Sequence, residues 1–125
     1  MSGILFFDGA CGMCTRAVNF IMRHNRTGEL RTEPLQGPGV AERLGVEPSH
    51  LLECNRWLDA SGAVYSGAEA MNAAVSTAIG TRLPLMVYRI PGIRFVEEAI
   101  YRWVATHRYR FRGTTPYCES NPAAC

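Results

Sequence analysis

The feature that most constrains this chain is an apolar run that stops directly at a C-x-x-C pair, Cys11 and Cys14. The β-branched and aromatic residues at positions 4–7 predict a buried strand, and Asp8 begins the turn that ends it. Apolar residues at helical spacing follow over residues 15–24. The sequence therefore predicts that Cys11 opens a helix at the end of a strand.

This position favours thiol chemistry. Unpaired N–H groups and the helix dipole stabilise a thiolate at a helix N-terminus, and they lower a cysteine pKa from about 8.5 to roughly 3.5–7.5. Cys14 lies three residues on, so it shares a helix face with Cys11 and can close a disulfide with it. We expect Cys11, at the exposed helix start, to be the nucleophile and Cys14, one turn deeper, to resolve the mixed disulfide.

Asp8 is the third candidate site residue. It precedes Cys11 by three residues, so it could accept a proton from the resolving thiol or tune the pair electrostatically. An Asp-Gly pair after a strand is also ordinary turn chemistry, and a carboxylate near Cys11 would raise the pKa of that thiol. Both interpretations of Asp8 stay open at this point.

The C-x-x-C pair also permits a metal site or two packed structural cysteines. A four-thiolate zinc site normally uses two such pairs, and the remaining cysteines stand at no recognised ligand spacing. Cys54 is predicted to be a small buried residue of a strand. Cys118 and Cys125 could pair with each other or resolve a disulfide elsewhere, but we expect bystander thiols. Redox chemistry is the favoured interpretation.

Four segments carry a resemblance to a known family. DGACGMC at 8–14 resembles the D-x-x-C-x-x-C signature of the DCC family of thiol–disulfide oxidoreductases, relatives of thioredoxin. PLQ at 34–36, DASG at 59–62 and YRWVATHRYR at 101–110 are similar to further segments of that family. The resemblance runs from Ile4 to about residue 113. It implies a thioredoxin-like fold and a thiol–disulfide chemistry, but no particular substrate.

The order of predicted elements agrees with this resemblance. Patterns along the chain predict strands at 4–7, 30–35, 53–58 and 63–65, and helices at 15–24, 40–44, 67–79, within 84–91 and at 93–109. This α/β order, βαβ-α-ββα with an added C-terminal helix, is the thioredoxin-like plan. Residues 1–113 then form one domain and 114–125 a flexible tail. One departure is that Leu-Leu-Glu precedes the third strand, where thioredoxin-like sites usually carry a cis-proline; Pro48 sits too early.

Composition excludes several function classes. The chain has 125 residues, which is enough to form one hydrophobic core without stabilising disulfides. All 13 basic residues are arginine, and the absence of lysine excludes Schiff-base and P-loop chemistry. The net charge of +2 and the lack of a regular aromatic platform argue against nucleic-acid binding. Charged residues and prolines interrupt the apolar stretch at 83–105, so no stable membrane insertion is expected. An odd number of cysteines and no secretory pattern favour a cytoplasmic, reducing setting.

For several aromatic, histidine and arginine side chains the sequence predicts ordinary structural roles. Trp57 and Trp103 are predicted to line the core or a groove, and the spacing of Phe95, Ala99 and Trp103 is typical of a packed stripe. Residues at the ends of predicted helices should cap them or face solvent; these are His24, His107 and Arg108.

The sequence thus predicts a small thiol–disulfide oxidoreductase. Cys11 and Cys14 would exchange two electrons with a disulfide- or thiol-containing protein or small molecule, with no bound cofactor and no metal. The alternative is a metal-binding or assembly module in which Cys11 and Cys14 are zinc ligands and a second chain or the tail supplies the others.

Overall fold

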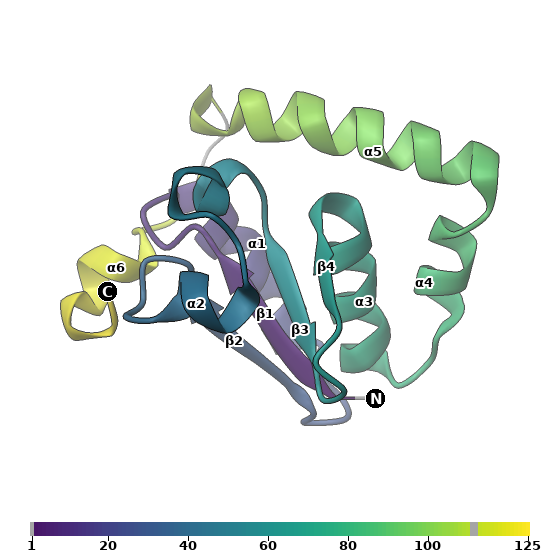
Figure 1. Ribbon diagram of the computed structural model, residues 1–125, viewed down its shortest axis with the longest axis horizontal. Coiled ribbons are helices and arrows are strands. Elements are labelled where there is room, and N and C mark those ends of the chain that lie inside the picture. The colour runs from purple at the N-terminus through teal and green to yellow at the C-terminus, as the bar shows by residue number, and fades with distance from the viewer. Residues whose placement is uncertain (1, 111–112) are drawn as a thin grey trace.

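A four-stranded sheet forms the centre of the molecule, in the strand order β2-β1-β3-β4 (Figure 1). The computed structural model describes residues 2–110 and 113–125. The strands are β1 (Gly3–Phe7), β2 (Leu30–Pro34), β3 (Arg56–Asp59) and β4 (Val64–Ser66). The helices are α1 (Gly12–Arg23), α2 (Val40–Leu44), α3 (Gly67–Ile79), α4 (Leu83–Tyr88), α5 (Pro91–Thr106) and α6 (Tyr117–Ser120). Three short 3₁₀ helices are η1 (Pro48–Glu53), η2 (Arg108–Arg110) and η3 (Pro122–Ala124).

The directions of the strands confirm the predicted fold class. β1 pairs in parallel with β2, and the helix α1 connects these two strands. On its other side β1 pairs antiparallel with β3, which in turn pairs antiparallel with β4. A βαβ unit followed by an antiparallel hairpin and a helix is the thioredoxin-like α/β arrangement. The predicted helices at 40–44 and 67–79 have the bounds of α2 and α3. Gly45 and Gly80 end these two helices at φ of 66° and 80°, a conformation that favours glycine.

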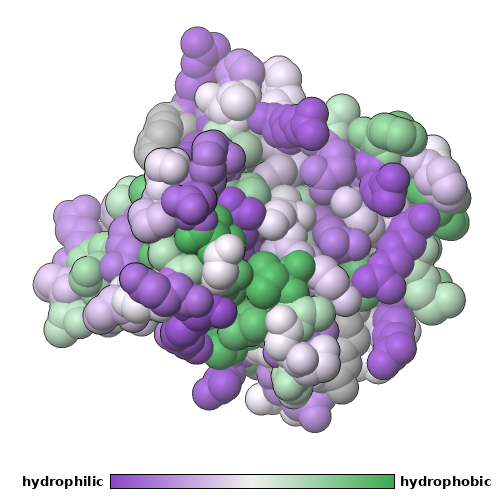
Figure 2. Space-filling model, viewed as in Figure 1, coloured by the Kyte–Doolittle hydropathy of each residue, from purple (hydrophilic) through white to green (hydrophobic). Residues whose placement is uncertain are grey.

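β1 is buried on both of its faces, because its side chains alternate between two core clusters. Leu5 and Phe7 pack with α1, α3 and Trp57, while Ile4 and Phe6 pack with Leu35 and α2 on the opposite face. Figure 2 shows apolar side chains gathered in the middle of the α2 side of the molecule, framed by polar ones. A continuous apolar strand is what a central strand between two layers requires.

The third strand begins later than predicted. Residues 48–53 form the 3₁₀ helix η1, with a proline at its start, and β3 begins at Arg56. Cys54 therefore ends η1 and is half-buried, so its prediction as a buried strand residue is wrong. Polar–apolar alternation does not distinguish a strand from a short turn that precedes one.

The helix α5 crosses one end of the sheet and packs along only part of its surface (Figure 1). Glu98 holds it in place, since its Oε1 accepts hydrogen bonds from Ala68 N at 3.1 Å and from the Tyr88 hydroxyl at 2.8 Å. Phe95 and Trp103 lie on the outer side and are 72% and 57% exposed. The predicted packed stripe is therefore wrong, and so is the core role of Trp103, whereas Trp57 is fully buried as predicted.

The apolar stretch at 83–105 is divided between α4 and α5, with a break at Ile90. In the part of the chain that the structure describes, no helix combines the length and the apolar character that crossing a membrane requires.

The last residues of the chain lie against the end of the sheet at which β1 stops. The sequence predicts a flexible tail over 114–125. In the structure, Cys118 N donates a hydrogen bond to Gly9 O at 2.9 Å, and Tyr117 N donates one to Thr15 Oγ1 at 3.1 Å. The Tyr117 ring also meets Phe7 edge to face, at 5.5 Å between ring centroids. These contacts bring α6 beside the C-x-x-C loop.

Candidate active site

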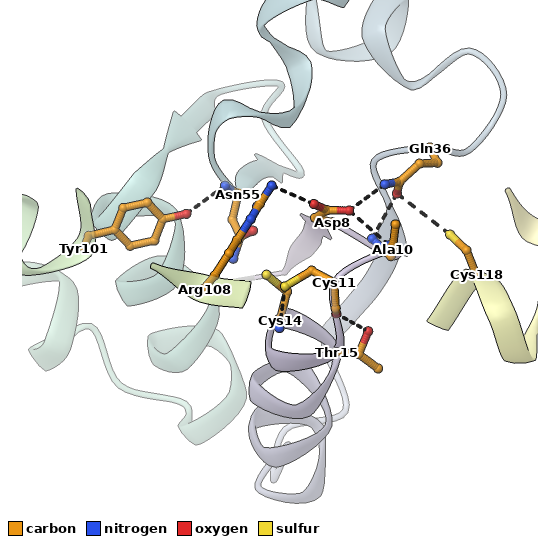
Figure 3. A network of polar contacts seen from close by, with 11 residues as sticks. Asp8, Ala10, Cys11, Cys14, Thr15, Gln36, Asn55, Tyr101, Arg108 and Cys118 are labelled. Carbon is orange, nitrogen blue, oxygen red and sulfur yellow. Dashed lines mark hydrogen bonds and ion pairs between the residues drawn. The ribbon is translucent and has the colours of Figure 1, made fainter. Parts of the chain in front are cut away.

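Cys11 and Cys14 lie together where β1 ends and α1 begins (Figure 3). Cys11 is the N-cap residue of α1, and its Sγ accepts a hydrogen bond from Cys14 N at 3.4 Å. Thr15 Oγ1 donates to Cys11 O at 2.9 Å and so anchors the same turn. As predicted, Cys11 opens the helix and has a helix-terminal N–H group directed at its sulfur.

Both cysteines are buried, which differs from the predicted exposure of Cys11. Cys11 is 1% exposed and Cys14 is 8% exposed, so the prediction that Cys14 lies deeper than Cys11 is also wrong. Residues on either side of Cys11 form hydrogen bonds with the segment 113–125. Thr114 N donates to Gly12 O at 3.2 Å, and Cys118 N donates to Gly9 O. A helix start is open to solvent only when nothing crosses it, and contacts with residues a hundred positions away are invisible to a local pattern.

The environment of Cys14 disfavours its thiolate. Burial raises the pKa of Cys14 to about 12, and the hydrogen bond with Cys11 and the charge of Cys11 add to this effect. The Arg108 guanidinium acts in the opposite direction and lowers the pKa of Cys14. Cys14 therefore remains a protonated thiol at neutral pH.

Asp8 is a buried carboxylate held from three sides. Its Oδ1 accepts hydrogen bonds from Ala10 N at 3.0 Å and from Gln36 Nε2 at 2.6 Å. Its Oδ2 pairs with Arg108 Nη2 at 2.9 Å, and the two side chains are 3% and 16% exposed. The first bond is the expected turn contact. The ion pair shows that Asp8 also carries a charge that the protein compensates from a distant segment.

Arg108 is the residue that the sequence reasoning missed. The sequence predicts it at a helix end or on the surface, but in the structure it reaches over the two cysteines to Asp8 (Figure 3). The predicted capping role is confirmed for His24 and His107, whose Nδ1 atoms lie 2.8 and 2.7 Å from backbone carbonyl oxygens of their own helices. A sequence signal for Arg108 exists, since the segments 8–14 and 101–110 both resemble the same family and each of them supplies one charged residue to the site.

Asn55 occupies the position just before β3, on the far side of the site from α1. Its backbone N–H donates to the Tyr101 hydroxyl oxygen at 2.9 Å, and its Nδ2 lies 3.0 Å from Met71 Sδ. The described residues 2–110 and 113–125 contain no cis peptide bond. Tyr101 of α5 thus contacts the backbone just before β3, the position at which thioredoxin-like sites usually carry a cis-proline.

A cavity of about 440 Å³ opens beside Cys14, between α1, α3 and α5. Its wall is mostly apolar, with Met13 from α1, Met71 from α3, and Ile100 and Val104 from α5. Tyr101 also lines it, and burial raises the pKa of this phenol to about 12, so it stays neutral. Cavities of this size and character accept an apolar group of a ligand.

A disulfide joins Cys118 and Cys125. The expectation that these residues are bystander thiols is therefore wrong, and the weaker alternative, a bond between them, is right. Cys118 Sγ lies 3.9 Å from Gln36 Oε1, which also accepts a hydrogen bond from Gly9 N at 2.9 Å. In the described part of the chain, His, Cys, Asp and Glu side chains form no group of three or more placed to hold a metal ion.

The chain is similar to known proteins over most of its length. Residues 5–114 match the family model described as DCC1-like thiol-disulfide oxidoreductase. A DCC family protein of Arabidopsis thaliana, named as chloroplastic, is 28% identical over 120 residues, which cover 93% of this chain and 68% of that protein. The uncharacterized protein YuxK of Bacillus subtilis (strain 168) is 26% identical over 119 residues, or 92% of this chain and 84% of YuxK. No solved structure gives a significant match.

Replacing Arg108 with leucine should destabilise the fold, because it leaves the Asp8 carboxylate buried without its cation. We expect the free energy of unfolding to fall by about 3 kcal/mol. The double variant Asp8→Asn/Arg108→Leu should recover part of this loss. Urea denaturation of both variants measures the difference.

The matched control is Arg43→Leu, which removes the arginine of the surface pair with Glu33, where both side chains are about two-fifths exposed. That change should cost less than about 1 kcal/mol. Equal losses for Arg108→Leu and Arg43→Leu would contradict a buried, structure-determining role for the Asp8–Arg108 pair.

Replacing Gly113 with alanine should uncover Cys11. A Cβ at Gly113 would collide with the backbone of Gly12 and Met13, so the crossing segment must lift. Overpacking of this kind costs about 1–3 kcal/mol, which raises the open population and the alkylation rate of Cys11 about tenfold. Mass spectrometry after timed iodoacetamide treatment measures the rate.

Gly92→Ala is the control, since a Cβ there meets no atom within 4 Å. It should leave the reactivity of Cys11 unchanged. If Gly113→Ala and Gly92→Ala react alike, the last segment does not control access to Cys11.

Proposed function

Since this chain belongs to the DCC1-like thiol-disulfide oxidoreductase family, we propose that Cys11 and Cys14 are its redox couple. The couple exchanges two electrons with a disulfide or dithiol in a protein or small molecule. The observation that carries this proposal is the pair itself: two free cysteines one helical turn apart, with the first at the N-cap of α1. No bound cofactor takes part, and a cytosolic, reducing setting fits this chemistry.

The two sulfurs have different roles in the proposed reaction. The Cys11 thiolate attacks one sulfur of the substrate disulfide, and the other substrate sulfur leaves as a thiolate that takes up a proton. Cys14 then loses its proton and attacks Cys11 Sγ, which releases the second substrate thiolate and leaves a Cys11–Cys14 disulfide. Two electrons pass to the substrate, and the protein gains one S–S bond.

The assignment of Cys11 as the nucleophile rests on its surroundings. Its sulfur accepts the Cys14 N–H hydrogen bond at the positive end of the helix dipole, where negative charge is favoured. Cys14 has a raised pKa and remains protonated until its turn in the reaction. This order suits an attacking thiolate followed by a resolving thiol.

Asp8 and Arg108 act on the second step. The Asp8 carboxylate already pairs with the Arg108 guanidinium and accepts two hydrogen bonds, so both of its oxygens are engaged. We therefore assign Asp8 a positioning role, in which it holds Arg108 near Cys14. The guanidinium lowers the pKa of Cys14 and so favours the thiolate that resolves the mixed disulfide.

The cavity beside Cys14 offers a place for the substrate. Its apolar wall suits an apolar group next to the reacting sulfur, such as a hydrophobic side chain beside a protein cysteine. Because the segment after Gly113 covers Cys11, attack on an external disulfide requires this segment to move.

Glutathione redox buffers test the couple directly. Cleavage after arginine places Cys11 and Cys14 together in the peptide 1–16, Cys54 in 44–56, and the tail cysteines in 113–125, so each bond is read separately. We expect the peptide 1–16 to lose two hydrogen atoms reversibly as the buffer becomes more oxidising. If it stays reduced at every accessible potential, the proposed function is wrong.

Single variants test the two roles. Cys14→Ser should leave a reactive Cys11 that retains partners as stable mixed disulfides, whereas Cys11→Ser should retain almost none. In Cys11→Ser, burial still raises the pKa of the remaining Cys14 thiol, so its alkylation should rise only above the pH at which a free cysteine reacts. Equal alkylation rates of the two variants at neutral pH would show that the assignment of roles is wrong.

A further inference from the structure

The disulfide in the last segment contacts the loop that carries Cys11. A Cβ built on Gly9 would lie 2.5 Å from Cys118 Sγ, so only a glycine at this position lets the sulfur approach the loop backbone so closely. Cys118 Sγ also lies 3.9 Å from Gln36 Oε1, whose amide group bonds to Gly9 N and to Asp8. One sulfur of the disulfide thus lies against Gly9, which precedes Cys11 by two residues.

Hydrogen bonds hold the segment across this loop. Cys118 N bonds to Gly9 O and Thr114 N bonds to Gly12 O, so the two contacts flank Cys11 on both sides. Figure 3 shows Cys118 next to Gln36 on one side of the loop, with Arg108 on the other. Residues 113–125 therefore occupy the side of the site away from Arg108 and the cavity.

The two sulfurs of this disulfide differ in their access to solvent. Cys118 is half-buried against the loop, whereas Cys125 is exposed. Cys11, by contrast, is only 1% exposed. A disulfide from outside the protein therefore reaches Cys11 less easily than the Cys118–Cys125 disulfide of the same chain does. The structure holds Cys11 and Cys14 as free thiols and Cys118 and Cys125 as a disulfide, which together are the reactants of an exchange.

We propose that Cys118–Cys125 is a second redox couple, which accepts two electrons from Cys11 and Cys14 of the same chain. The Cys11 thiolate attacks Cys118 Sγ, the S–S bond breaks, and Cys125 leaves as a thiolate and takes up a proton. Cys14 then gives up its proton and attacks Cys11 Sγ, which releases Cys118 as a thiolate. One disulfide forms and one is reduced. The exposed Cys125 thiolate then attacks an external disulfide and releases one of its thiols, and Cys118 resolves the mixed disulfide, so that the Cys118–Cys125 bond forms again and the external disulfide gains two electrons.

A purely structural role explains these contacts less well. The bond closes a short loop, with a sequence separation of 7, and neither of its cysteines belongs to the two core clusters. In a reducing compartment, disulfides of this kind are usually transient and redox-active. The inference rests on the proposed function of Cys11 and Cys14, so its test separates the two.

The test traps the intermediate inside the chain. In Cys14→Ser/Cys125→Ser, Cys11 and Cys118 remain without their partners, and oxidised glutathione should join them. The expected product links the peptides 1–16 and 113–125 through Cys11 and Cys118. The matched variant Cys14→Ser/Cys118→Ser keeps Cys125 instead, and proximity predicts about tenfold less linked peptide in it. The two variants differ only in the tail cysteine that remains, so a shared folding defect does not produce the difference.

Equal or absent linkage in the two variants would overturn the relay. The variant Cys118→Ser/Cys125→Ser then reports on the proposed function alone. If its Cys11–Cys14 disulfide forms in glutathione buffers while the Cys11–Cys118 link does not, the redox function stands and the second couple does not exist. If Cys11–Cys14 never forms, both proposals are overturned.

Discussion

A buried carboxylate that needs a cation is the constraint on which the site depends. Asp8 ends β1 inside the protein, and its negative charge is compensated by Arg108, which follows α5. Burying a charge without a partner costs several kcal/mol, so the end of α5 must return to the end of the sheet. This return places Tyr101 against Asn55 and closes the cavity beside Cys14. The helix that lies outside the core plan thus completes the site.

The same end of the sheet also receives the last residues of the chain. Contacts at Gly9 and Gly12 cover Cys11, and both positions need a glycine because the crossing segment approaches them so closely. Cys11 and Cys14 are therefore interior residues, enclosed by Arg108 on one side and by the Cys118–Cys125 segment on the other. Thiol chemistry in such a place depends on access as much as on the pKa of each sulfur.

Much of the fold could be predicted from local patterns. The apolar run before the C-x-x-C pair, the alanine-rich helix at 67–79 and the glycines that end helices act within a few residues, so the order of elements and the fold class follow from them. Trp103 shows where such patterns fail. Its spacing is typical of a packed stripe, but whether a partner surface exists is decided by the rest of the fold, and here it faces solvent.

The site divides in the same way. Strand, turn and helix signals are local, so the sequence alone predicts that Cys11 begins a helix after a buried strand, with Cys14 one turn on. Long-range contacts in the folded chain account for the pairing of Arg108 with Asp8, the burial of Cys11 and the position of the Cys118–Cys125 bond beside Gly9. Those contacts join residues up to about a hundred positions apart. They exist because a buried charge and a closely approached backbone each require a partner, and the folded chain alone determines which segment provides it.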